Sequence, residues 1–128
     1  MVTLNHTNLT TFDVPALTQF FCSVFAFQVT HQRTDKLAVL ENAHGFLLTL
    51  MYDKQMSAGH GYPGMFHIGF RQPGPADVDA MHAVLTAQNY AAPQPGKLQR
   101  GGPTAYGFYC NALGGVVVEV STMNIDPA

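Results

Sequence analysis

The sequence predicts an α+β fold in which one βαβββ unit occurs twice within a single chain. The first observation is a repeated segment. The sequence Asp13-Val14-Pro15-Ala16-Leu17 recurs in similar form as Asp77-Val78-Asp79-Ala80-Met81. Each copy follows a short strand-like segment and opens a segment with helical spacing of apolar residues. Three strand-like segments then follow each predicted helix. A simple α+β sandwich without an internal repeat is the alternative, and the repeated helix start favours duplication.

The first predicted unit covers about residues 1–54. A strand at 4–9 precedes a helix that begins after Asp13, whose side chain can accept hydrogen bonds from the free backbone N–H groups of the first turn. Three strands follow at 28–32, 36–40 and 46–52, with a turn at 41–45. The helix has an apolar face formed by Leu17, Phe20, Phe21, Val24 and Phe25.

The second predicted unit covers about residues 64–122 and repeats this order. A strand at 65–70 leads to a helix that Asp77 would N-cap, and strands follow at 91–98, 104–110 and 116–121. A turn at 111–115 separates the last two strands. A glycine-rich linker at about 55–63 joins the two units, so we expect residues 1–128 to form one domain.

The composition is that of one globular domain. A chain of 128 residues with 47% hydrophobic and 11% charged residues can bury a core and is unlike disordered chains. A net charge of −2 without a basic cluster argues against nucleic-acid binding, and no apolar run is long enough to span a membrane. Cys22 and Cys110 form neither a CxxC motif nor a disulfide-rich pattern, so we expect reduced thiols in a cytoplasmic protein.

Three side chains in strand-like segments are candidate metal ligands. Glu119 lies within a run of valines, where an ionised carboxylate loses several kcal/mol of solvation unless a cation or hydrogen-bond donors meet it. His6 and His67 lie in two further strand-like segments. Two imidazoles and one carboxylate from separate strands can form a facial metal triad with open positions. Alternatively, Glu119 pairs with Arg71 or Arg100, and the histidines pack within their strands.

The alternation of strands assigns these side chains to faces of the sheet. His67 shares a face with Gly69 and Arg71, and Glu119 shares a face with Val117 and Ser121. For His6 the alternation does not separate core from cavity. The remaining histidines are interpreted as surface or loop residues, namely His31, His44, His60 and His82.

The most specific motif lies near the C-terminus. It reads Phe108-Tyr109-x-x-Ala112-Leu113-x-Gly115-x-x-x-Glu119, and Leu4-x-His6-x-x-Leu9 and Phe66-His67-x-x-Phe70 are two further motifs. With these motifs the chain resembles the vicinal oxygen chelate superfamily, which includes glyoxalase I, extradiol dioxygenases, fosfomycin-resistance enzymes and bleomycin-binding proteins. The resemblance covers nearly the whole chain. The family ending is Phe-Tyr-x-x-Asp-Pro-x-Gly-x-x-x-Glu, so Ala112 and Leu113 depart from it at the turn.

This resemblance implies a fold, a site and an assembly. The two βαβββ modules form a curled mixed sheet, and His6, His67 and Glu119 bind one divalent metal, which is Fe(II), Mn(II), Zn(II) or Ni(II). The fourth position, a carboxylate in glyoxalase I, falls near Thr49, so a three-ligand site is implied. Small members usually form their cavities from two chains, so we expect a homodimer. The resemblance implies that the residues orienting or protonating the substrate are Tyr109, Asn8 or Arg71.

Two classes of function follow from the resemblance. One is a metal-dependent lyase, isomerase, transferase or dioxygenase whose small substrate chelates the metal through adjacent oxygens. The other is a metal-free protein of the bleomycin-resistance kind that sequesters a small molecule. The stretch Arg100-Gly101-Gly102 lacks the histidine of extradiol dioxygenases, and Asn8 replaces a threonine of fosfomycin enzymes. The three ligand-type residues favour the enzyme.

Overall fold

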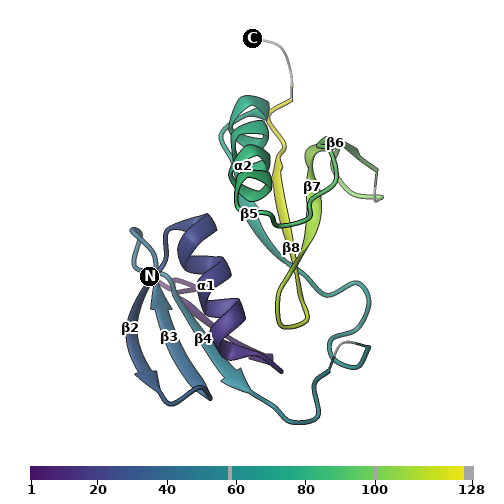
Figure 1. Ribbon diagram of the computed structural model, residues 1–128. Helices are drawn as coiled ribbons and strands as arrows, with labels where there is room; N and C mark the ends of the chain where they lie inside the picture. Colours follow the sequence, from purple (N-terminus) through teal and green to yellow (C-terminus); the bar gives the residue numbers. More distant parts are fainter. Residues whose placement is uncertain (58, 100, 126–128) are drawn as a thin grey trace. The chain divides into compact units, whose positions relative to one another are not determined.

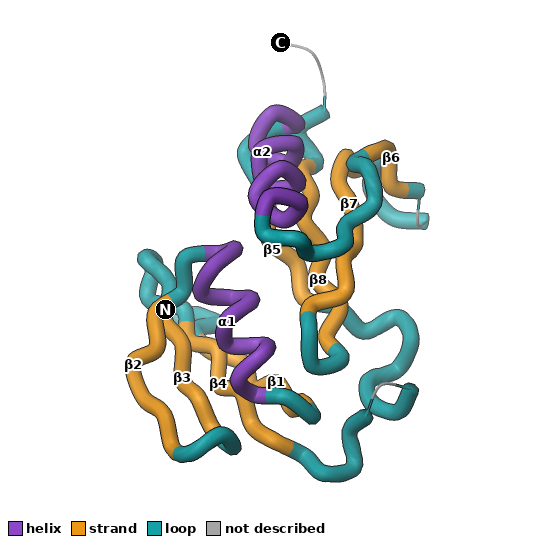
Figure 2. The backbone as a smooth tube through the Cα atoms, in the orientation of Figure 1, coloured by secondary structure: helices purple, strands orange, loops and turns teal. Residues whose placement is uncertain are grey.

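The computed structural model describes residues 1–57, 59–99 and 101–125. It divides into two compact units, of which the first comprises Met1–Gly64 with Ala112–Gly115 and the second comprises Met65–Asn111 with Val116–Ala128. Each unit has one helix and one four-stranded sheet, and neither sheet is closed (Figures 1 and 2). The predicted α+β fold with two βαβββ modules is therefore confirmed.

In the first unit the sheet has the order β1-β4-β3-β2, and α1 covers one of its faces (Figure 1). β1 runs parallel to β4, whereas β3 is antiparallel to both of its neighbours. The elements are β1 (His6–Thr11), α1 (Val14–Phe25), β2 (Gln28–Arg33), β3 (Leu37–Glu41) and β4 (Leu47–Tyr52). The core between α1 and the sheet includes the fully buried side chains of Leu17, Phe20, Phe21, Leu40 and Leu50.

The start of α1 agrees with the prediction. Asp13 is the N-cap, and its Oδ1 accepts a hydrogen bond of 3.0 Å from the backbone N–H of Ala16. The helix ends at Ala26, which adopts the left-handed conformation with φ 59°. Phe20 and Phe21 pack edge to face, with ring centroids 5.5 Å apart, beneath the sheet.

The second unit repeats this topology, with the strand order β5-β8-β7-β6. β5 runs parallel to β8, and β6 is antiparallel to β7. The elements are β5 (Ile68–Arg71), α2 (Pro75–Ala87), β6 (Gly96–Leu98), β7 (Ala105–Ala112) and β8 (Val116–Thr122). The helix packs on β8, and the fully buried residues there are Val78, Leu85, Val116, Val118 and Val120.

Several predicted boundaries in this unit differ from the structure, and β5 begins at Ile68 instead of residue 65. α2 begins at Pro75 with Gly74 as its N-cap, and Asp77 lies in the first turn. Proline suits the first helical position because its missing N–H has no partner there in any case. Of the strand expected at 91–98, only Gly96–Leu98 forms a strand, which is β6. Pro93 and Pro95 cannot donate hydrogen bonds to a neighbouring strand.

The turn between β7 and β8 requires two glycines. Gly114 and Gly115 have φ angles of 85° and 95°, a region that residues with a Cβ rarely adopt. The glycine pair therefore permits this turn although Ala112 and Leu113 stand where the family has Asp-Pro.

Neither helix in the described ranges has the length and apolarity needed to cross a membrane. Both cysteines are free thiols. Burial raises the pKa of Cys110 to about 11 and also raises the pKa of Cys22. Both thiols therefore stay protonated at neutral pH and are poor nucleophiles.

Candidate metal centre

His67 and Glu119 lie close together in the second unit. Glu119 is in the middle of β8 and is 8% exposed, whereas His67 immediately precedes β5 and is exposed. Nε2 of His67 lies 3.9 Å from Oε2 of Glu119. The register partner of Glu119 on β5 is Gly69, where an added Cβ would lie 3.2 Å from Oε2. The glycine thus leaves the space that the carboxylate uses.

Glu119 occupies the face of the sheet that does not carry α2. Val118 and Val120 are fully buried on the helix side, so the alternation of β8 directs Glu119 to the opposite face. The pairing agrees, because Ile68 is opposite Val118 and Gly69 is opposite Glu119. This is the face that the sequence pattern predicts for Glu119.

A hydrogen bond determines which nitrogen of His67 faces the carboxylate. Nδ1 of His67 lies 3.0 Å from the carbonyl oxygen of Met65. A carbonyl oxygen only accepts, so Nδ1 carries the proton of the neutral ring and Nε2 keeps its lone pair. A lone pair and a carboxylate oxygen then face each other. A cation between them, either a proton on the imidazole or a metal ion, would stabilise this arrangement.

The donor atoms of this pair suit a divalent metal. Imidazole nitrogen and carboxylate oxygen bind zinc at about 2.0–2.2 Å, so two ligands of one ion lie roughly 3–3.5 Å apart. The distance between Nε2 of His67 and Oε2 of Glu119 is 3.9 Å, slightly longer than this range. A ligating histidine usually donates its other N–H to a carbonyl or carboxylate. Nδ1 of His67 does so toward Met65.

His6 is placed at the start of β1 in the first unit, with an exposed side chain. Leu9 and Thr11 are buried on the helix side, so His6 and Asn8 occupy the other face of this sheet. The sequence pattern had not shown on which face of the sheet His6 lies, and the structure places it on the face away from α1. Nδ1 of His6 lies 2.7 Å from Oδ1 of Asn5, so the Nε2 atom of His6 also keeps its lone pair.

The other predicted site residues differ in their surroundings. Tyr109 on β7 is half-buried, and its ring lies edge to face with that of His67 at 5.2 Å between centroids. Arg71 is exposed at the end of β5, opposite Ser121. Asn8 is in the first unit, where its Nδ2 donates to the sulfur of Met51 at 2.9 Å. Arg100, the alternative partner of Glu119, lies outside the described residues.

The structure therefore brings together His67, Glu119 and Tyr109, all within the second unit. Over residues 1–57, 59–99 and 101–125, no cluster of three or more His, Cys, Asp or Glu side chains is close enough to hold a metal ion. His6 belongs to the first unit.

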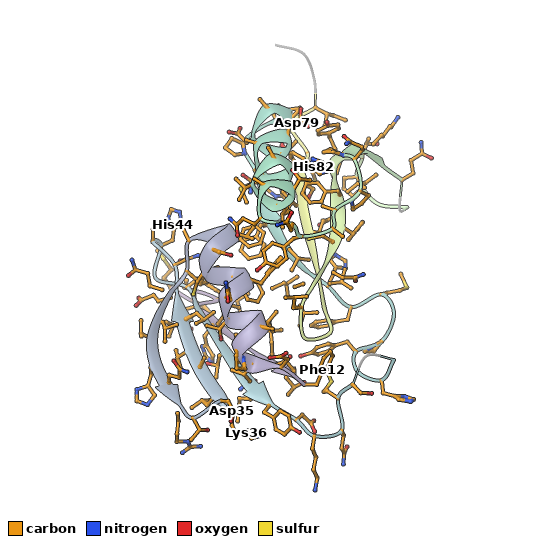
Figure 3. All side chains as sticks on the ribbon, in the orientation of Figure 1. Phe12, Asp35, Lys36, His44, Asp79 and His82 are labelled. Atoms are coloured by element: carbon orange, nitrogen blue, oxygen red, sulfur yellow. The ribbon has the colours of Figure 1, made fainter. Side chains whose placement is uncertain are left out.

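His82 was expected at the surface but packs against the second sheet. Its ring contacts Phe108 edge to face at 5.5 Å, and its Nε2 lies 3.2 Å from the carbonyl oxygen of Ala92. Figure 3 shows His82 and Asp79 both on α2. Asp79 accepts a 2.6 Å hydrogen bond from the hydroxyl of Tyr106, which raises the pKa of Tyr106. These contacts join α2 to β7 and are structural.

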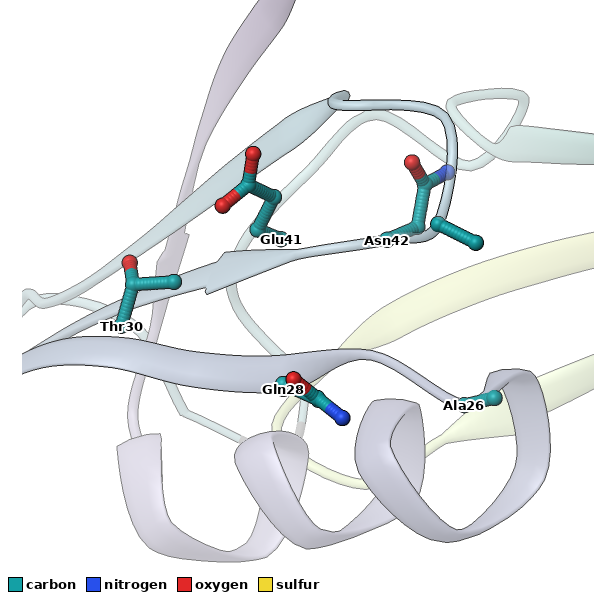
Figure 4. A pocket seen from close by; sticks show the side chains of 6 residues that line it. Ala26, Gln28, Thr30, Glu41 and Asn42 are labelled. Carbon is teal, nitrogen blue, oxygen red and sulfur yellow. The ribbon is translucent and has the colours of Figure 1, made fainter.

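The first unit has a pocket that the sequence analysis did not predict. It lies where β2 begins and β3 ends (Figure 4). Its volume is about 170 Å³. Glu41 supplies its one charged side chain, because this residue ends β3 instead of lying in the expected turn. None of the predicted metal ligands contributes to its lining, which consists of Ala26, Gln28, Thr30, Glu41, Asn42 and Ala43.

Comparisons with known proteins agree with this fold. A family model described as the Glyoxalase/Bleomycin resistance protein/Dioxygenase superfamily matches residues 3–104, which include His6 and His67 and end before Glu119. The structure of a possible glyoxalase from Bacillus cereus is 31% identical, covering 94% of this chain and 98% of that chain with a TM-score of 0.77. No curated protein matches the sequence.

Two further structures share the fold at lower identity. Lactoylglutathione lyase from Agrobacterium tumefaciens is 21% identical, with 95% of this chain and 94% of that chain covered and a TM-score of 0.73. A glyoxalase/bleomycin resistance protein/dioxygenase from Alicyclobacillus acidocaldarius is 12% identical, with 94% and 90% covered and a TM-score of 0.71.

Proposed function

Because this chain belongs to the Glyoxalase/Bleomycin resistance protein/Dioxygenase superfamily, we propose that it is a metal-dependent enzyme of the vicinal oxygen chelate type. Its substrate is a small molecule that chelates a divalent metal through adjacent oxygens. The observation that carries the proposal is the pair formed by His67 and Glu119, in which an imidazole lone pair lies 3.9 Å from a carboxylate oxygen. Such a pair attracts a cation.

The ligands in this proposal are His67 and Glu119 together with His6, and the metal is Fe(II), Mn(II), Zn(II) or Ni(II). The types of ligand do not identify which of these ions is bound. Held by these residues, the ion would supply Lewis-acid chemistry at the substrate oxygens. The hydrogen bonds at Nδ1 of both histidines support the assignment, because they leave Nε2 available as a ligand.

The side chains around the pair would act on the substrate. Tyr109 has its ring against that of His67, so its hydroxyl is the first candidate to orient or protonate a bound substrate. Arg71 is exposed and can attract an anionic substrate group, and Asn8 can hydrogen-bond to one. The reaction is that of a lyase, isomerase, transferase or dioxygenase.

Metal reconstitution tests the proposal directly. Protein incubated with each of the four ions and then desalted should retain one ion per chain by elemental analysis. The affinity should fall below about pH 6, because protonated imidazoles cannot ligate. Retention of none of the four ions would contradict the proposal. It would favour the metal-free binding protein of the bleomycin-resistance kind, which should bind an aromatic ligand equally well in the presence of a chelator.

We propose that residues 1–128 act as one cytoplasmic domain that assembles as a homodimer. The homodimer is a testable part of this proposal, because sedimentation at micromolar concentration should give the mass of two 13.9 kDa chains. A monomer under these conditions would contradict it.

A further inference from the structure

A short hydrogen bond connects the side chains of two neighbouring residues at the start of β1. Nδ1 of His6 lies 2.7 Å from Oδ1 of Asn5, at the short end of the range for N–H···O hydrogen bonds. The amide oxygen can only accept, so the imidazole nitrogen donates. The neutral ring of His6 is therefore protonated at Nδ1 and has its lone pair at Nε2.

The backbone of Asn5 is held in place although its side chain is exposed. The N–H of Leu47 on β4 donates a 2.9 Å hydrogen bond to the carbonyl oxygen of Asn5, and His6 is in register with Leu47. The sheet thus fixes both Cα positions from which the two side chains extend. The Asn5 amide can reach the imidazole without leaving the strand.

His67 in the second unit has the same arrangement with a different acceptor. Its Nδ1 lies 3.0 Å from the backbone carbonyl of Met65. In both units the acceptor comes from a residue just before the histidine in the chain, and in both the Nε2 atom is left as the basic nitrogen. The first unit uses a side chain for this task, so substitution can remove it there.

We propose that Asn5 is a positioning residue that holds His6 in the tautomer needed for ligation through Nε2. The tautomer claim stands on the geometry of Asn5 and His6 alone, and the consequence for metal affinity rests on the proposed function. Removing the acceptor lets the proton move to Nε2 and lets the ring rotate. Loss of such an outer partner typically weakens metal binding by roughly 10- to 100-fold.

Nitrogen NMR of the metal-free protein measures the tautomer without requiring any activity. Spectra recorded at about pH 8.5, where ordinary imidazoles are neutral, should show His6 protonated at Nδ1. In Asn5→Leu the His6 signals should shift toward the Nε2-protonated form. Asn5→Asp keeps an acceptor oxygen at this position and should retain the native tautomer. His67 is an internal control, because its acceptor is a backbone carbonyl and its signals should not move in either variant.

Metal titration of the same proteins supplies the second measurement. Asn5→Leu should bind the metal roughly 10- to 100-fold more weakly than the parent protein, and Asn5→Asp should stay near the parent affinity. A parent His6 protonated at Nε2, or a tautomer that Asn5→Leu leaves unchanged, would overturn the assignment. A shift of tautomer in a protein that binds no metal would uphold the role of Asn5 and refute the metal-dependent function instead.

Discussion

Substitution of Glu119 by alanine is expected to abolish retention of the divalent metal while leaving the chain folded. Glu119 supplies the only carboxylate of the proposed ligand set, and the pair that it forms with His67 would then lack its negative charge. The loss should exceed the roughly 10- to 100-fold typical of an outer-shell partner, because a direct ligand is removed. His67→Ala should have the same result, since it removes the nitrogen that lies 3.9 Å from the carboxylate.

Glu41→Ala is the matched control, because Glu41 is the one other glutamate in the sequence. It lines the pocket of the first unit and should leave the metal content unchanged. The measurements are metal per chain after desalting and the rise in melting temperature that a bound ion produces. Wild-type metal content in both Glu119→Ala and His67→Ala would disprove the ligand assignment.

Substitution of Gly107 by alanine should have the largest effect on stability. A Cβ at this position on β7 would overlap the carbonyl oxygen of Val120 and lie 2.7 Å from the Cα of Ser121. Both obstacles belong to the backbone of β8, which is held between β5 and β7 and cannot easily move away. Overpacking of a core costs about 1–3 kcal/mol. A clash with backbone should reach the upper end of this range or exceed it.

Gly96→Ala is the control for this prediction. Gly96 on β6 is the register partner of Gly107, but a Cβ there would have no atom within 4 Å. Its effect on the free energy of unfolding should stay within about 1 kcal/mol, and removal of a glycine can even stabilise the chain. Urea unfolding of the two variants measures the difference. Equal stabilities would show that β7 and β8 are spaced differently from the structure.

The order of the elements in this protein was predictable from local patterns. The apolar face between Leu17 and Phe25 has helical spacing, and the cap at Asp13 acts through its own first turn. The valines flanking Glu119 alternate between the faces of β8 for the same local reason. The motifs around His6, His67 and Glu119 predicted the family as well.

Contacts between segments that lie far apart in the sequence could not be predicted and are known only from the tertiary structure. The approach of His67 to Glu119 depends on the parallel register of β5 and β8, and the room for the carboxylate depends on Gly69 being its partner there. The sequence predicted His6 and His67 as ligands, but it contained no sign of the acceptors at Asn5 and Met65 that set their tautomers, because these contacts depend on side-chain rotamers and not on residue spacing. Side-chain periodicity reports the face on which a residue lies, whereas strand register arises only when segments far apart in the chain pair.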